Sequence, residues 1–318
     1  MPEERTIPAV RWTWALIIIA AILAFSFGLA HEDFWYDETY SAAMAEHDIL
    51  QIVQLTTHDF HPPLYYLLLR GVRLVIGNSD WALRLLSVWG AVALVCLGAG
   101  PIRRAVGPSA AIAYAVLLLF TPAALIYAHE ARMYIWAAFA VMASATYGFL
   151  AARDNKAWDW VLFTCSSVAA SYLQYYCVIA VFQVYLFLGV WLLRKNPRRL
   201  KPLLLTAGCV IMAYLPWVFF LAAQAVKVRS AFWISYFNGL AVLAAYVTPF
   251  SYKELYPGVT WSAALLGALL PAVTIIGGLL AARKAPGDAL FILLGLVVFN
   301  GTLFTALYIS TVFAPVYV

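Results

Sequence analysis

The chain has 318 residues, of which 65% are hydrophobic and only 11% are charged. Soluble domains carry about 25% charged residues, so this composition excludes an ordinary soluble globular protein. The net charge of +5 therefore does not indicate nucleic-acid binding, and the positions of the basic residues report on membrane topology instead. The cysteines all lie in apolar runs, which is typical of small core residues and not of a disulfide or zinc set.

Apolar runs of roughly 18–23 residues recur along the chain, and each is long enough to cross a membrane as a helix. They predict an all-α, polytopic membrane protein, a single module over residues 1–318. The first run is interpreted as a retained helix because it is longer than the apolar part of a signal peptide. We expect about nine transmembrane helices, at 12–30, 80–100, 108–128, 133–152, 158–175, 176–193, 203–223, 260–282 and 287–309.

Two further apolar segments, 62–77 and 238–250, are short, and whether they cross the membrane decides the topology. If neither crosses and the N-terminus is cytoplasmic, most basic residues fall in short inner loops, as the positive-inside rule requires. If 62–77 crossed, Arg103, Arg104 and later basic clusters would move outside. The nine-helix topology is therefore preferred. It places all five histidines and most acidic residues on the extracytoplasmic side, where such crowding of titratable groups predicts a functional site.

The first extracytoplasmic loop, 31–79, is long for a connection between spans but is not disordered in composition. Its segment 42–55 has the periodicity of one amphipathic helix, and 62–76 predicts a second helix that starts at proline. Both are typical of helices that lie along the membrane interface, a depth that also suits Trp35 and Tyr36.

Two groups of residues in this loop have the composition of a reactive site. Asp37 and Glu38 directly follow the first span, and such a pair can act as a base, bind a cation, or simply be solvated. Adjacent side chains diverge, so we expect one carboxylate to face a cleft and the other to brace it. Further along, His58, Asp59 and His61 precede two prolines, which either form a plain helix start or fix a corner that aims His61 into a cleft.

Two arginines complete the pattern. Arg84 lies four residues after Asp80 and either pairs with it on one helix face or is free to bind a ligand. Arg132 lies in the outer turn that also holds Glu130 and Tyr134, and alone it is equally typical of an interfacial anchor. The two arginines lie at one depth on one face of the predicted bundle. Together they supply the planar, permanently charged donors that a phosphate headgroup requires.

Several motifs are absent from the sequence. There is no Walker A loop, no Gly-rich dinucleotide fingerprint and no inner loop large enough for a nucleotide domain, so an activated donor must arrive from within the bilayer. Zinc-protease and serine-hydrolase motifs are also missing.

The order of these motifs resembles the lipid-linked-sugar glycosyltransferases of the GT-C superfamily, in particular the protein O-mannosyltransferases and lipid A aminoarabinose transferases. The resemblance covers roughly the first 135 residues. It rests on four segments, namely Tyr36-Asp37-Glu38, His61-Pro62-Pro63-Leu64-Tyr65-Tyr66, Ala82-Leu83-Arg84-Leu85-Leu86-Ser87 and Glu130-Ala131-Arg132-Met133-Tyr134. Family members usually run longer, so the resemblance implies that their usual C-terminal part is absent here.

The resemblance implies an enzyme that moves a sugar from a polyprenyl-phosphate donor to a glycan, lipid or protein acceptor, with inversion, outside the bacterial plasma membrane. It implies Asp37 and Glu38 as catalytic residues and His61, Arg84 and Arg132 as ligands of the donor phosphate. Cleft residues would be Tyr36, Asp59, Tyr65, Glu130 and Tyr134. Some relatives bind a divalent metal ion, for which Asp37, Glu38, His58 and His61 are the candidate ligands.

Two other classes of protein are compatible with the same residues. A transporter or flippase of lipid-linked intermediates would use the arginines to hold a phosphate, but such proteins often have inverted repeats and charges at mid-membrane, which this sequence lacks. An accessory binding protein would share the fold without catalysis, and only the Asp37-Glu38 pair argues against it.

Overall fold

The computed structural model describes residues 6–31, 33–231, 276, 290–298 and 300–302, and within them all regular structure is helical. An apolar helix also runs through the described residues of 290–302. The other elements are α1 (Thr6–Ser26), α2 (Tyr36–Met44), α3 (Ile49–Thr56), α4 (Leu64–Val75), α5 (Asp80–Leu97), η1 (Gly98–Ile102), α6 (Arg103–Val106), α7 (Pro108–Phe120), α8 (Pro122–Ala128), α9 (Tyr134–Asp154), α10 (Ala157–Leu173), α11 (Tyr175–Lys195), η2 (Pro197–Arg199) and α12 (Leu200–Ala231).

Four helices in the described part of the chain are long and apolar enough to cross a membrane: Asp80–Val106, Tyr134–Asp154, Tyr175–Lys195 and Pro197–Gln224. A fifth span results if α7 and α8, which meet at 63°, are counted together. The bend follows from Pro122, because the residue before a proline is forced out of the helical region, and Thr121 is extended. These lengths and compositions indicate a helical integral membrane protein.

The prediction of nine spans is met only in part. The segment 260–282 and most of 287–309 lie outside the described residues. In α1, the apolar helix Arg11–Ser26 is shorter than the four spans, and α10 has 17 residues. Nine spans therefore remain a prediction.

The helices pack closely through small residues, as is common between helices in membranes. At Gly148 of α9, an added methyl group would lie 2.9 Å from both Phe163 of α10 and Leu188 of α11. Beside it, the hydroxyl groups of Ser144 and Ser167 join α9 to α10 at 2.9 Å. This packing gives a rigid bundle that holds the segments at its ends.

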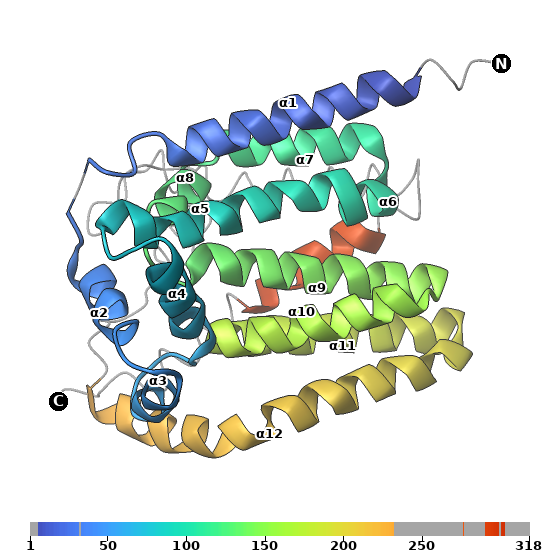
Figure 1. Cartoon of the computed structure of the whole chain (residues 1–318). Coiled ribbons are helices and arrows are strands. Elements are labelled where there is room, and N and C mark those ends of the chain that lie inside the picture. Colours follow the sequence, from blue (N-terminus) through green and yellow to red (C-terminus); the bar gives the residue numbers. More distant parts are fainter. Residues whose placement is uncertain (1–5, 32, 232–275, 277–289, 299, 303–318) are drawn as a thin grey trace.

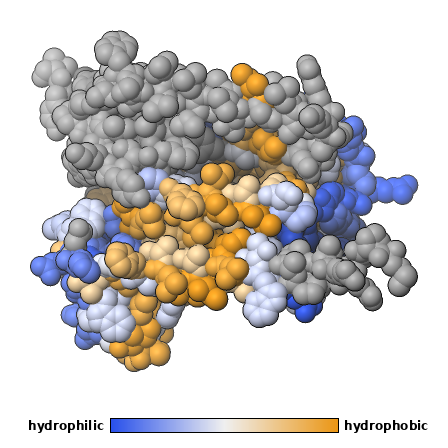
Figure 2. Space-filling view, turned by 90° about the horizontal axis from the view of Figure 1, so that it is seen from above, coloured by the Kyte–Doolittle hydropathy of each residue, from blue (hydrophilic) through white to orange (hydrophobic). Residues whose placement is uncertain are grey.

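The two ends of the bundle differ in charge. Arg104 after α5 binds Asp159 of α10 through two contacts of 2.8 and 2.7 Å, and Arg153 donates to the Arg104 carbonyl oxygen. In Figure 1, α6 marks this end, while α2, α3, α4 and α8 lie at the other. Figure 2 shows hydrophobic side chains in the middle of the described surface and hydrophilic ones toward both ends. The basic loops and the histidine-rich segments therefore occupy opposite ends.

The segment between α1 and α5 differs from the sequence prediction in one respect. The single helix expected over 42–55 is wrong, because the chain forms α2 and α3 with a break between them. Asp48 causes the break as the N-cap of α3: its Oδ1 accepts from Gln51 N at 2.8 Å, and Gln51 Oε1 accepts from Asp48 N at 3.1 Å. The second predicted helix is confirmed as α4, with Pro63 at its N-cap.

Candidate functional site

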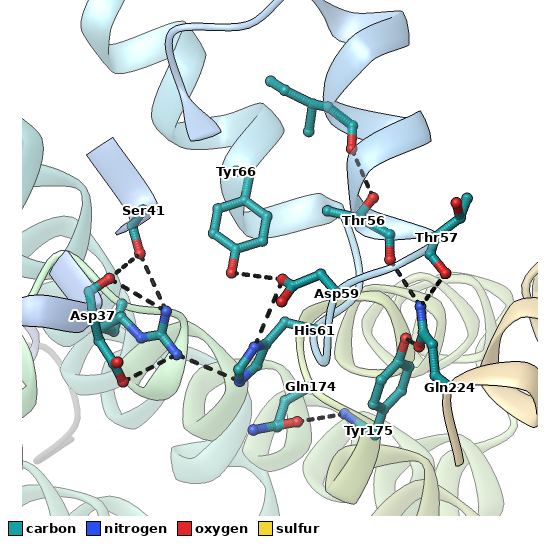
Figure 3. Close-up of polar contacts among 12 residues, drawn as sticks. Asp37, Ser41, Thr56, Thr57, Asp59, His61, Tyr66, Gln174, Tyr175 and Gln224 are labelled. Carbon is teal, nitrogen blue, oxygen red and sulfur yellow. Dashed lines mark hydrogen bonds and ion pairs between the residues drawn. The ribbon is translucent and has the colours of Figure 1, made fainter. Parts of the chain in front are cut away.

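Polar side chains from three separate segments converge at the end of the bundle that holds α2, α3 and α4. Asp37 and Ser41 come from α2, and Asp59 and His61 come from the corner between α3 and α4 (Figure 3). Arg132 comes from the turn before α9 and contacts Asp37, Ser41 and His61. Sequence reasoning selected four of these five residues, and the fold brings all of them into one cluster.

Glu38 and Arg84 form a buried ion pair at the base of this cluster. Arg84 Nε and Nη2 donate to the two carboxylate oxygens at 2.8 and 2.7 Å, and the side chains are 5% and 1% exposed for Arg84 and Glu38. The same carboxylate accepts from Ala131 N at 2.7 Å, while Arg84 also donates to the carbonyl oxygens of Leu29 and Asp33 at 3.2 Å. Both groups thus have short, well-placed partners, and the pair fastens α2 to α5 and to the 131 turn.

Arg132 is as buried as Arg84, at 3% exposure, but its guanidinium is held loosely. Its contacts with the cluster are 3.4 Å to the Asp37 carbonyl oxygen, 3.3 Å to Ser41 Oγ, 3.4 Å to His61 Nε2 and 3.5 Å to Asp37 Oδ2. The Tyr134 side chain is a further partner. Good charge-assisted hydrogen bonds are about 2.7–2.9 Å long. Its Nε is buried and has no hydrogen-bond partner among the described residues. Arg132 therefore has donor capacity that the protein does not use.

Asp37 and Glu38 diverge as expected for adjacent residues. The Asp37 side chain keeps 34% of its surface exposed, whereas that of Glu38 keeps 1%. The only charged contact of Asp37 within the described segments is the long one to Arg132. Asp37 is therefore the carboxylate that faces outward, and Glu38 braces it.

His61 lies between Arg132 and Asp59. Since arginine only donates hydrogen bonds, His61 Nε2 must accept, which leaves the proton on Nδ1, 3.9 Å from Asp59 Oδ2. Burial and the charge of Arg132 lower the pKa of His61 from 6.5 to about 4, although the charges of Asp59 and Asp37 oppose this. His61 is thus uncharged at neutral pH and cannot attract a phosphate as a cation.

Asp59 is surrounded by hydroxyl donors. Tyr66, itself fully buried, donates to Asp59 Oδ2 at 3.2 Å. Burial and the neighbouring charge of Asp59 raise the pKa of Tyr40 to about 12, so this hydroxyl stays protonated as a second donor. These contacts hold the Asp59 side chain and so fix the corner between α3 and α4.

Glu130 is a third carboxyl group near Asp37 and Glu38. Its Oε2 is buried without a hydrogen-bond partner in the described part of the protein. Burial and then the charge of Glu38 raise the pKa of Glu130 to about 7, although Arg132 opposes the shift. At neutral pH this group is therefore partly protonated, which limits the negative charge beside Asp37.

Glu130→Gln is expected to become more stable relative to the wild type as the pH rises. The folded-state pKa of Glu130 lies above its unfolded value, so its contribution to stability is complete below pH 4.5 and lost as pH passes about 7. Glutamine mimics the protonated acid and does not ionise. After discounting for partial exposure, the difference should be on the order of 1–2 kcal/mol. Thermal unfolding in detergent from pH 5 to 8.5 measures it, and parallel curves for the two proteins would contradict it.

The other predicted cleft residues differ in exposure. Tyr36 is 83% exposed, whereas Tyr65 is fully buried with its hydroxyl 3.4 Å from Ser87 Oγ, as in a packed core. The ring of Tyr134 lies 5.6 Å from the Arg132 guanidinium, in cation–π range. Sequence reasoning missed Ser41, whose signal is its position four residues after Asp37 on α2.

The candidate metal ligands do not come together. No group of three or more histidine, cysteine, aspartate or glutamate side chains in the described residues has the geometry to hold a metal ion. Glu38 is occupied by Arg84 and Ala131, and His58 Nδ1 faces the Thr57 hydroxyl at 2.8 Å. These residues therefore do not fit a shared metal site in this arrangement.

No family model, curated protein or solved structure matches the chain.

Proposed function

We propose that the protein is a glycosyltransferase that uses a polyprenyl-phosphate sugar. It would transfer the sugar at the end of the bundle that holds α2, α3 and α4. The observation that carries the proposal is the loosely held Arg132 beside the outward-facing Asp37. A buried guanidinium with unused donors is suited to a phosphate oxygen, and a nearby exposed carboxylate is suited to take a proton from a hydroxyl group. The resemblance of the four motifs to GT-C transferases agrees with this pairing.

The proposed reaction is an inverting displacement at the anomeric carbon. The acceptor hydroxyl oxygen attacks that carbon as the bond from carbon to the phosphate oxygen breaks. The hydroxyl proton passes to the Asp37 carboxylate, and the electron pair of the broken bond stays on the polyprenyl phosphate. Arg132 then stabilises the charge that develops on this leaving group.

Donor binding and base activation are linked in this proposal. Arg132 is only 3% exposed, and Asp37 Oδ2 is 3.5 Å from its Nη2. A phosphate oxygen that reaches the guanidinium must compete with this carboxylate. Once the phosphate binds Arg132, the Asp37 carboxylate is released from this contact and can turn toward the acceptor hydroxyl, so the base is free when the donor is present.

We propose other roles for three residues that the sequence analysis grouped with Asp37 and Arg132. We assign Arg84 and Glu38 to holding the site together, because each is saturated by the other and by backbone groups. We assign His61 to an uncharged hydrogen-bonding role beside Arg132. The phosphate contact of the proposal is therefore Arg132.

The proposed location is the bacterial plasma membrane with the site outside. Its support is the separation of charge, since the Arg104 and Arg153 clusters lie at the opposite end of the bundle, as cytoplasmic loops require.

The experiment that tests the function is product analysis with oriented vesicles. Vesicles of both orientations are incubated with polyprenyl-phosphate mannose or aminoarabinose and with glycan, lipid and peptide acceptors, followed by mass spectrometry. A glycosylated product only when the acceptor faces the Asp37 end would support the proposal. Bound donor that moves across the bilayer without transfer would instead identify a flippase, and bound donor with neither outcome would identify an accessory protein.

Arg132→Lys is expected to weaken donor binding by about 10-fold or more, because lysine lacks the planar pair of donors. The measurement is the affinity of purified protein in nanodiscs for polyprenyl-phosphate mannose. The matched control is Arg73→Lys, since Arg73 of α4 lies at the same end of the bundle (Figure 1) but pairs with the exposed Glu46. Equal affinities for wild type and Arg132→Lys would remove Arg132 from the site.

A further inference from the structure

The corner between α3 and α4 carries Asp59 and His61 but has no helix or strand of its own. Its backbone forms a turn in which Asp59 N donates to the Thr56 carbonyl oxygen at 3.3 Å. Carbonyl groups at the end of a helix lack partners within the helix and need donors from elsewhere. The placement of both site residues therefore depends on what binds the carbonyl groups at the end of α3.

A glutamine far along the sequence supplies these donors. Gln224 of α12 donates through Nε2 to the carbonyl oxygens of Thr56 and Thr57, at 2.8 and 2.9 Å (Figure 3). The Gln224 side chain is 4% exposed, so both hydrogens of its amide nitrogen are directed to α3 inside the protein. Gln224 thus acts as a C-terminal cap of α3 that comes from a different helix.

The amide of Gln224 is itself held in place. Its Oε1 accepts from the Tyr175 hydroxyl at the start of α11, and Tyr175 in turn accepts from Trp217 Nε1 at 3.0 Å. Trp217 lies seven residues before Gln224, so the two side chains share one face of α12. Figure 3 shows Gln224 and Tyr175 on one side of the corner and Asp37 on the other. A closed set of hydrogen bonds therefore connects α11 and α12 to the corner.

We propose that Gln224 is a positioning residue that holds the α3–α4 corner and so keeps Asp59 and His61 in a fixed position relative to Arg132. Gln224 acts through the backbone and not by contact with a substrate. The inference rests on the proposed function only where it treats the corner as part of the active site. The hold on the corner itself follows from the contacts alone.

Two variants separate this role from simple filling of space. Gln224→Met keeps the length and most of the volume of the side chain but removes both donors, so a space-filling role predicts little change. Tyr175→Phe removes only the hydrogen bond that orients the amide. The matched control is Gln54→Met, because the Gln54 side chain is exposed on α3 and makes no hydrogen bond among the described residues.

The readout is the accessibility of His61. Diethylpyrocarbonate modifies histidine rings that solvent reaches, and mass spectrometry gives the rate at His61 with the exposed His47 as an internal reference. Loss of two buried hydrogen bonds should favour local opening of the corner, so Gln224→Met should raise the His61 rate about five-fold or more. Tyr175→Phe should give a smaller increase, and Gln54→Met none.

The results distinguish this inference from the proposed function. An unchanged His61 rate in Gln224→Met and Tyr175→Phe would overturn the positioning role. If Gln224→Met does not fold, the Tyr175→Phe rate decides alone. Faster His61 modification together with reduced sugar transfer would support both proposals. Faster modification with unchanged transfer would support the hold on the corner and exclude the corner from the active site.

Discussion

Arg84→Met is expected to destabilise the protein by about 3–5 kcal/mol, because it leaves the Glu38 carboxylate buried without its counter-ion. Glu38 is 1% exposed and both of its oxygens accept from Arg84. Methionine fills the volume of the arginine stem, so most of the loss reflects the unpaired charge and not a cavity. Unfolding of the purified protein in mixed detergent micelles measures the change.

The double variant Glu38→Gln, Arg84→Met tests the cause of this loss. It removes both charges but keeps an oxygen that accepts from Ala131 N, so it should be more stable than Arg84→Met alone. The control is Arg73→Met, which breaks the pair with Glu46, whose side chain is 64% exposed, and should change stability by no more than about 1 kcal/mol. Equal losses for Arg84→Met and Arg73→Met would mean that the buried pair is not what holds α2 against α5.

The convergence of the motifs was predictable from sequence because it depends on periodicity and charge alone. Apolar runs of membrane length alternate with short loops, and basic residues mark one set of loops. All segments in the other set must then meet at the opposite end of the bundle, whatever the details of packing. For this reason the sequence alone could predict that Asp37, His61 and Arg132 lie at the same end of the bundle.

The partners of individual side chains were not predictable in the same way. Spacing offered Asp80 as a neighbour of Arg84, but the carboxylate that Arg84 binds belongs to Glu38, 46 residues away. Gln224 lies 168 residues from Thr56 and carries no local signal beyond an amide at the end of an apolar run. Such pairs arise from tertiary packing, which has no counterpart in the spacing of residues along the chain.

The break between α2 and α3 was accessible in principle. Asp48 followed three residues later by Gln51 is a capping box, which marks the start of a helix. The hydrophobic periodicity of 42–55 continues through this capping box, so the apolar pattern alone predicts one helix where the structure has two. The local cap outweighs the periodicity because it satisfies backbone donors that a continuous helix would not expose.

Asp37→Asn is expected to lower the rate of sugar transfer by about 10²–10⁴-fold, equivalent to about 3–5 kcal/mol of activation free energy. Asparagine keeps the size of aspartate and an oxygen toward Arg132, but it cannot accept the proton of the acceptor hydroxyl. The side chain is 34% exposed, so the substitution should not affect folding. Turnover with a defined polyprenyl-phosphate sugar and acceptor is the measurement.

The donor affinity of the same variant gives a second, independent result. Asp37 Oδ2 lies 3.5 Å from Arg132 Nη2 and would compete with a phosphate that binds there. Asp37→Asn should therefore bind donor at least as tightly as the wild type while transferring far less sugar. Asp33→Asn is the matched control, because it makes the same change of charge at an exposed side chain of the same segment. That control should retain both affinity and turnover. Near-normal turnover in Asp37→Asn would show that another group takes the proton, and the assignment of Asp37 as the base would then be wrong.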